Sequence, residues 1–215
     1  MKNNFCTIYI VRHAQSLQNA EYREKLETLT KAGGLGTKLT ALGIKQAKNR
    51  AEDFKNIHFD KIFSSDFLRA KQTADIIALE HNLTVETNKL LRERSWGNFE
   101  EKIHKLDWDR IRSLRRGLTD MEKLKLKIAK GVETEEHALT RFMRFLKKTA
   151  VWCPNKTIMV VCHGNIMRSL LVKLGINTYD SLSSGTIENV GYFICKTDGE
   201  DFKISKMVGV NPSNS

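Results

Sequence analysis

The 215-residue sequence predicts an α/β fold: a three-layer sandwich with a mostly parallel central sheet flanked by helices, plus a helical cap insertion. Three observations favour this class. Short apolar runs alternate with longer segments of helical period. Hydrophobic residues make up 40% of the chain and charged residues 28%, which is ordinary globular usage. The length suits one domain, or one domain that carries an insertion.

The expected elements follow one another in a regular order. Residues 6–11 are apolar and β-branched, so we expect a buried strand there. A helix is expected over 43–54, because Ile44, Ala47, Ala51 and Phe54 fall on one helical face. The remaining expected elements are a strand over 61–64, a helix over 66–80, a strand over 83–87, a helix over 135–150, a strand over 157–162, a helix over 165–174, and a hairpin of 190–195 with 202–205.

The segment from about 100 to 131 does not fit this alternation. It is rich in lysine and arginine, with amphipathic helical stretches and no expected strand. We therefore expect one domain over 1–215 with a lid or specificity cap inserted at about 100–131. The alternative is a solvated helical decoration without a role at the site.

The charge balance bounds the partners of the protein. Thirty-six Lys and Arg against 25 Asp and Glu give a net charge of +11, which favours phosphorylated metabolites, nucleic acid or a membrane surface. No nucleic-acid motif is present, and no apolar run approaches the ~20 residues of a membrane span, so neither of those two partners is expected. No signal-peptide apolar region is seen, and a cytoplasmic location is expected. The four cysteines are expected to be reduced thiols.

Three predicted strands end in cationic or reactive residues. The first is followed by Arg12 and His13, the second by Ser65 with Arg69 beyond it, and the late strand by His163. Ligands of open α/β sheets bind outside the carboxyl ends of the strands, where helix amino termini also attract anions. Two histidines and two arginines at such an edge predict a phosphate pocket.

These residue types suit phosphoryl transfer. A neutral imidazole nitrogen can attack phosphorus and form a phosphohistidine, and arginines with a second histidine can stabilise the charge of the transition state. The leaving oxygen needs a proton, for which Glu93 is the first candidate and Asp66 and Glu86 are the others. This chemistry needs no metal, and no cysteine–histidine cluster has metal-ligand spacing.

In their order, the motifs resemble those of the histidine phosphatase superfamily, which includes cofactor-dependent phosphoglycerate mutases and fructose-2,6-bisphosphatases. The resemblance implies the phosphoglycerate mutase-like form of the α/β sandwich. The matching segments are Arg-His-Ala-Gln-Ser at 12–16 with Asn19, Leu-Thr-Ala-Leu-Gly at 39–43 with Gln-Ala at 46–47, Ser-Ser-Asp-Phe-Leu-Arg-Ala at 64–70 with Thr-Ala at 73–74, Leu-Arg-Glu-Arg at 91–94 before Trp-Gly at 96–97, Cys-His-Gly at 162–164, and Asn189 before Val190.

The resemblance also implies roles for individual residues. His13 would be the nucleophile that becomes phosphorylated, and Glu93 the proton donor. The residues that would bind the transferring phosphoryl group are Arg12, Arg69 and His163. Those that would shape the rim of the pocket or contact the phosphate are Gln15, Ser16, Asn19, Gly164 and Asn165.

Three functions stay open, and the phosphatase is favoured. An arginine pair, Arg115 and Arg116, stands where phosphoglycerate mutases bind the substrate carboxylate, which favours a mutase primed by 2,3-bisphosphoglycerate. However, the chain is shorter than those mutases, and the proline-rich stretch expected after the pair is missing from 118–130. We therefore expect a metal- and cofactor-independent phosphomonoesterase. A non-catalytic phosphate-binding module is the alternative from another class.

The sequence departs from the family pattern at two places near the predicted pocket. Ala14 replaces the usual glycine beside the nucleophile, and the stretch 17–38 is longer than in compact relatives. We expect that stretch to be a loop that could close over substrate, with specificity residing there and in 100–131. The basic cap suggests a small substrate with more than one anionic group, such as a sugar bisphosphate or a phosphoglycerate. A monomer and a homodimer are both compatible with the sequence.

Overall fold

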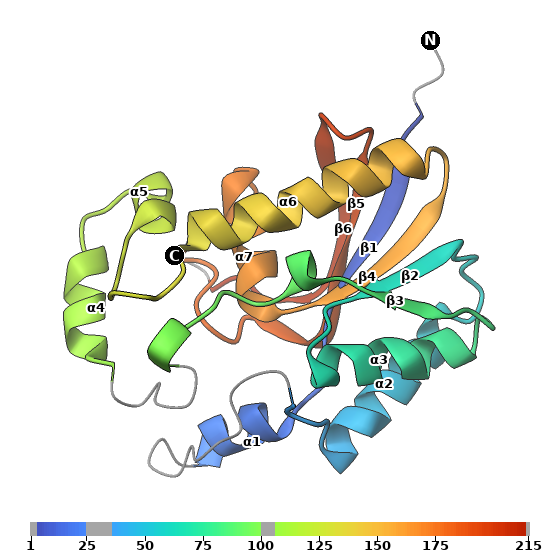
Figure 1. Cartoon of the computed structure of the whole chain (residues 1–215), viewed down its shortest axis with the longest axis horizontal. Helices are drawn as coiled ribbons and strands as arrows, with labels where there is room; N and C mark the ends of the chain where they lie inside the picture. Colours follow the sequence, from blue (N-terminus) through green and yellow to red (C-terminus); the bar gives the residue numbers. More distant parts are fainter. Residues whose placement is uncertain (1–3, 25–35, 100–105, 214–215) are drawn as a thin grey trace.

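The computed structural model describes residues 4–24, 36–99 and 106–213 and contains one six-stranded sheet (Figure 1). The strand order is β3-β2-β4-β1-β5-β6. The strands are β1 (Cys6–Arg12), β2 (Lys61–Ser64), β3 (Val85–Thr87), β4 (Thr157–Cys162), β5 (Ile187–Thr197) and β6 (Phe202–Val210). The helices are α1 (Leu17–Glu24), α2 (Ala41–Phe54), α3 (Leu68–Leu79), α4 (Trp108–Arg115), α5 (Asp120–Lys125), α6 (Glu135–Trp152) and α7 (Gly164–Lys173), with 3-10 turns η1 (Lys89–Leu91) and η2 (Gly97–Phe99).

The sheet is parallel in its first four strands and antiparallel at the other edge. β3, β2, β4 and β1 run in the same direction, β5 is antiparallel to β1, and β6 is antiparallel to β5. In the β1–β4 pair Arg12 stands opposite Cys162, so the two strands end at the same level. Their continuous apolar runs are those of strands covered on both faces.

Helices cover both faces of the sheet, which confirms the expected three-layer α/β sandwich. α6 and α7 pack on one face around a core that includes Ile10, Phe142 and Leu170. α2 and α3 pack on the other around Phe54 and Ile77. Figure 1 shows the two helix pairs on opposite sides of the strands.

The elements differ from the sequence expectations mainly at their ends. β3 begins at Val85, and β5 and β6 extend well beyond the expected hairpin. α3 begins at Leu68 because Phe67 is extended and serves as the N-cap. The expected loop at 17–38 is wrong over its first part, which is helix α1. Ser16 precedes this helix and its hydroxyl accepts the amide hydrogen of Asn19, as a capping serine does.

The cap expected at about 100–131 carries α4 and α5 in its described part, 106–131, at one side of the sandwich (Figure 1). Its division from the rest of the chain stays a prediction. Lys123 ties α5 to Asp180 through two contacts of 3.0 Å. The glycine-rich run at 33–36 lies almost wholly outside the described residues. Within the described parts of the chain, no helix combines the length and the apolar character that a membrane span needs.

Candidate active site

Two histidines meet where β1 and β4 end. His13 follows β1 and His163 follows β4, and the amide of His13 donates to the carbonyl of Cys162 at 2.9 Å. The centroids of the two imidazole rings are 5.1 Å apart. Both side chains are buried. The parallel pairing of the strands therefore brings together two residues that are 150 positions apart in the sequence.

Arg69 joins the two imidazoles. It lies in the first turn of α3, with 5% of its surface exposed. Its Nε donates to Nε2 of His13 at 3.2 Å, and its Nη2 lies 3.4 Å from Nδ1 of His163. Thr73, one turn further along α3, donates to the carbonyl of Arg69 at 2.7 Å and accepts from the amide of Ala14 at 3.0 Å. One helix thus fixes the arginine and the loop that carries His13.

Hydrogen bonds select the tautomer of each histidine. Nδ1 of His13 lies 2.7 Å from the carbonyl oxygen of Ala14, which can only accept, so Nδ1 carries the hydrogen and Nε2 keeps its lone pair. Nε2 of His163 lies 2.9 Å from Oγ of Ser65, while its Nδ1 faces the Arg69 donor. Nε2 of His13 and Nδ1 of His163 are thus the unprotonated nitrogens of the pair, and both lone pairs face the Arg69 guanidinium.

The surroundings keep both rings uncharged. Burial lowers the pKa of His13 well below the ordinary value, and the positive charges of Arg69 and Arg12 lower it further. The pKa of His163 is likewise lowered, first by burial and then by Arg69 and the neighbouring His13. Because only a neutral imidazole has a lone pair to offer, this environment favours nucleophilic attack by His13 at neutral pH.

Arg12 lies against the start of α7. Its Nη1 donates to the carbonyl of Ile187 at the start of β5. A Cβ atom at Gly164 would lie 3.1 Å from Nε of Arg12. The glycine after His163 thus leaves room for the guanidinium beside the amino terminus of α7.

The Leu-Thr-x-x-Gly-x-x-Gln element supports the loop after His13. Thr40 caps α2 and binds Gln15, its amide donating to the Gln15 carbonyl at 3.0 Å and its hydroxyl to Oε1 at 2.7 Å. Oε1 of Gln46 accepts the Gln15 amide at 2.9 Å. A Cβ at Gly43 would lie 2.0 Å from the Gln15 carbonyl oxygen, so only glycine allows α2 this close to the loop.

The predicted rim residues also build the loop. Ser16 is fully buried and donates to Oδ1 of Asn19 from its amide at 3.2 Å and from its hydroxyl at 3.1 Å. Nδ2 of Asn189 donates to the carbonyl of His13 at 3.0 Å. The next residue, Val190, has a positive φ of 56°, which is uncommon for a β-branched side chain. β5 therefore bends where it contacts the His13 loop.

Glu93 is bound to the amino terminus of α7. Its Oε1 accepts the amides of Arg94 at 3.0 Å and Ile166 at 3.1 Å, and its Oε2 accepts the amide of Asn165 at 2.9 Å. The flanking cations pair elsewhere, Arg92 with Asp66 and Arg94 with Glu135. Glu93 thus lies within one helical turn of His163.

The other two acid candidates are held in ion pairs. Asp66 receives two hydrogen bonds from Arg92, at 2.7 and 2.6 Å, and this pairing, stronger than the effect of its partial burial, lowers its pKa. Glu86 forms an exposed ion pair with Lys61 at 3.1 Å. Glu93 is therefore the acid candidate that the fold brings to the site.

A buried ion cluster beside the site was not foreseen from the sequence. Glu135, at the start of α6, is 3% exposed and accepts from Arg94 at 3.2 Å and from Arg115 at 3.0 Å, with Arg168 at 3.9 Å. Arg115 therefore anchors α4 to α6, whereas Arg116 is exposed. The residues of this cluster are far apart in the sequence and form no motif, so the cluster could not be predicted from the sequence.

Two further residues that hold the site carry only a weak sequence signal. Ser65 orients His163, and Thr73 supports Ala14 and Arg69. Both lie inside the matched segment 64–74, but their side chains are not chemically distinctive. Among the described residues, no group of three or more histidine, cysteine, aspartate or glutamate side chains is placed to hold a metal ion.

Comparison with known proteins agrees with this arrangement. The model of the histidine phosphatase superfamily (branch 1) matches residues 8–209. The probable phosphoglycerate mutase GpmB of Yersinia pestis (strain Pestoides F) is 38% identical over 95 residues, and so is that of Yersinia pseudotuberculosis serotype O:1b (strain IP 31758). The aligned part covers 44% of this chain and only 41% of those relatives.

Solved structures share the fold over nearly the whole chain. A mycobacterial glucosyl-3-phosphoglycerate phosphatase has a TM-score of 0.74 and 21% identity, covering 97% of this chain and 100% of that one. The phosphoglycerate mutase of Bacillus anthracis str. Sterne has a TM-score of 0.71 and 24% identity, covering 96% and 94%. At these identities the likeness shows the fold, and the sheet with its flanking helices is common to all of them.

Proposed function

This chain belongs to the histidine phosphatase superfamily, and on that premise we propose that it is a metal-independent phosphomonoesterase acting on a small phosphorylated metabolite through a phosphohistidine on His13. One observation carries the proposal. The bond from Nδ1 of His13 to the Ala14 carbonyl leaves Nε2 with its lone pair, beside Arg69 and next to the second neutral histidine. That is the state in which an imidazole attacks phosphorus.

In the first step Nε2 of His13 forms a bond to phosphorus while the ester P–O bond breaks. The leaving oxygen takes a proton from Glu93. Both lone-pair positions of Oε1 are occupied by amides, whereas among the described residues Oε2 accepts one amide, that of Asn165, so Oε2 has room for the proton. The three amides then stabilise the carboxylate that remains.

The cations stabilise the charge that spreads over the phosphoryl oxygens. Arg69 can move its N–H groups from the two imidazoles to the incoming oxygens without moving its backbone, and Arg12 lies beside the amino terminus of α7. His163, held by Ser65, adds a third contact. In the second step water attacks phosphorus, Glu93 takes its proton, and the N–P bond breaks.

The substrate class is inferred from the charge of the cap. α4, α5 and the segment after them present exposed Arg112, Arg116, Lys125, Lys127 and Lys130. These cations favour a small substrate with more than one anionic group, such as a sugar bisphosphate or a phosphoglycerate. The same proposal includes that the protein acts on this metabolite in the cytoplasm and that it does not bind nucleic acid.

A phosphoglycerate mutase primed by 2,3-bisphosphoglycerate is the second candidate. It is favoured by the likeness to the Yersinia proteins. Against it, Arg115, which would bind the substrate carboxylate, is committed to Glu135. A phosphate-binding module without catalysis would keep the pocket but not need a proton donor, and the anchored Glu93 speaks against it.

The test follows phosphate release in EDTA for the intact protein, His13→Ala and, as a matched control, His58→Ala, whose side chain is 90% exposed. The substrates are an aryl phosphate, fructose bisphosphates, and phosphoglycerates with and without 2,3-bisphosphoglycerate. We expect release by the intact protein and the control, and none by a folded His13→Ala. Full activity of His13→Ala would overturn the proposal, and primer-dependent isomerisation without release would assign the mutase instead.

A further inference from the structure

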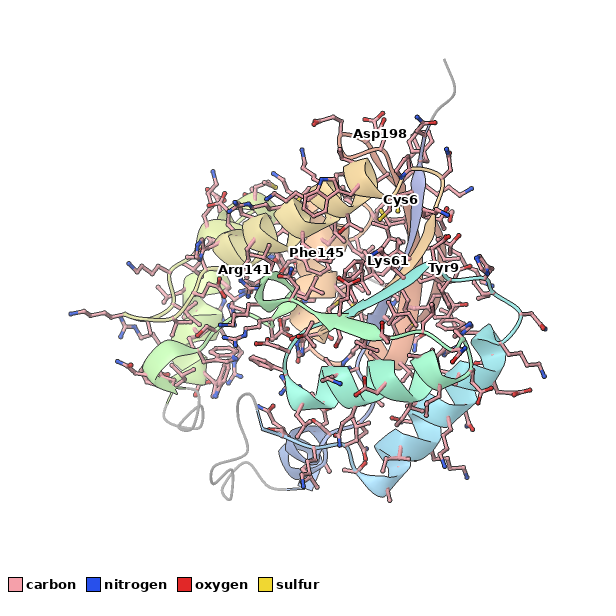
Figure 2. All side chains as sticks on the ribbon, turned by 45° about the vertical axis from the view of Figure 1, so that its right-hand side comes forward. Cys6, Tyr9, Lys61, Arg141, Phe145 and Asp198 are labelled. Atoms are coloured by element: carbon pink, nitrogen blue, oxygen red, sulfur yellow. The ribbon has the colours of Figure 1, made fainter. Side chains whose placement is uncertain are left out.

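We propose that Arg141, together with Glu133, is a clamp that positions Glu93 for proton transfer; this inference rests on the proposed function. Arg141 lies on α6, toward the end that faces the cap, and Figure 2 shows it there. It does not belong to any motif of the sequence. Its role follows from which backbone atoms its guanidinium contacts.

The chain around Glu93 has no regular structure to hold it. η1 ends at Leu91 and η2 begins at Gly97, and within the described residues no strand or helix gives the carbonyls of Arg92 and Glu93 hydrogen-bond partners. Arg141 supplies those partners: Nη1 donates to the carbonyls of Leu90 at 2.9 Å and Arg92 at 2.6 Å, and Nη2 donates to the carbonyl of Glu93 at 2.8 Å. One side chain thus fixes the backbone on which the proton donor stands.

Glu133 completes the clamp. Its carboxylate accepts from Nε and Nη2 of Arg141, each at 3.0 Å, so that all five N–H groups of the guanidinium are used. The same carboxylate accepts the amide of Ser95 at 2.9 Å, and the amide of Glu133 donates to the Ser95 carbonyl at 2.9 Å. The chain is therefore held on both sides of Glu93.

The two ends of Glu93 are thereby held by two different helices. Its backbone is fixed to α6 through Arg141, and its carboxylate to α7 through the amides of Asn165 and Ile166. Without the clamp, the backbone could drift and draw the carboxylate away from the amides of α7. Because displacement by about 1 Å costs on the order of 10²-fold in rate, a planar fork that reaches three carbonyls suits the task, and a lysine does not.

The test uses the dependence of rate on the leaving group. A proton donor matters for an alkyl phosphate, whose leaving oxygen is strongly basic, and little for 2,4-dinitrophenyl phosphate. We expect Arg141→Met and Arg141→Lys to lose about 10- to 100-fold in kcat on the alkyl phosphate and less than about 3-fold on the dinitrophenyl ester. Glu93→Gln should show the same pattern more steeply, and Glu133→Gln more weakly.

Two controls separate positioning from general damage. Arg144→Met changes an exposed arginine one turn further along α6 and should leave both rates unchanged. Arg69→Lys weakens the phosphoryl contacts and should lower both rates alike. Equal losses on both esters in Arg141→Met, no loss at all, or a Glu93→Gln variant without leaving-group dependence would each overturn the inference, while the proposed function would still stand on His13.

A second measurement does not depend on activity. Amide hydrogen exchange at Asn165 and Ile166 reports whether the Glu93 carboxylate still occupies the amino terminus of α7. We expect faster exchange at these two amides in Arg141→Lys, and unchanged exchange in Arg144→Met. Protection equal to that of the intact protein would refute the clamp, even if the protein proved to be inactive on every ester.

Discussion

Replacing Gly43 by alanine tests how closely α2 must approach the His13 loop. A Cβ at this position would lie 2.0 Å from the carbonyl oxygen of Gln15 and 2.9 Å from its carbon. Real Cβ contacts essentially never fall under 3.0 Å, and the atoms met are backbone, so helix and loop must separate by about 1 Å. Helix propensity alone predicts the opposite outcome, because alanine is favoured over glycine by ~1 kcal/mol inside a helix.

The magnitudes follow from these two opposing effects. Overpacking costs about 1–3 kcal/mol, so the propensity gain leaves a net loss of about 0–2 kcal/mol in the free energy of unfolding. The loop also carries His13, and its displacement by about 1 Å should reduce turnover on the order of 10²-fold. Activity should therefore fall far more than stability does.

The assay pairs urea unfolding with phosphate release. Asn49→Ala is the matched control, since it lies on the exposed face of the same helix and should gain at most ~0.7 kcal/mol without loss of turnover. If Gly43→Ala were as stable as that control and retained full activity, a glycine at this position would not be needed for the close approach of α2 to the loop.

The remaining predictions concern buried polar groups. Glu135→Leu should lower the free energy of unfolding by about 3–5 kcal/mol because it strands buried arginines, and a loss under about 1 kcal/mol in urea would contradict this. Burial opposes ionisation of Glu135, but the three arginines outweigh it and lower its pKa in the folded protein. Its contribution should thus be complete above the ordinary carboxyl pKa and disappear as the pH falls through the folded value, so the two proteins should converge in stability on acidification. For His13 and His163, burial and then Arg69 lower the pKa, so the unfolded chain binds more protons below pH ~6.5. As the pH is lowered, the free energy of unfolding should then fall by up to ~1.4 kcal/mol per pH unit for each histidine. A urea midpoint that does not change between pH 6.5 and 5 would count against neutral rings. Ser65→Ala removes the partner of His163 Nε2 and should reduce turnover about 10-fold in a folded protein; unchanged turnover would show that Ser65 does not orient the ring.

The sequence by itself determined the sheet and pointed to the chemistry proposed at its edge. The bounds of β2 and β4 match the expectations because apolar, β-branched runs between turns leave the chain little choice. Arg12, His13, Arg69 and His163 could be foreseen together, because parallel strands end at a common edge and each residue stands at such an end or in the first turn of the helix that follows it. Glu93 could be named, but not its attachment to α7.

Only the tertiary structure decided what holds that chemistry in place. Glu135 and Arg141 come from a helix whose sequence shows no more than an apolar face, and their partners other than the nearby Glu133 lie 20 to 51 residues away in the chain. From the sequence, Arg115 could be either a substrate ligand or an anchor for α4. Its ion pair with Glu135 indicates the anchor. Hydrophobic periodicity is a local property that can be read directly from the sequence. A hydrogen bond between distant polar groups depends on how the layers pack, and that exists only in the folded chain.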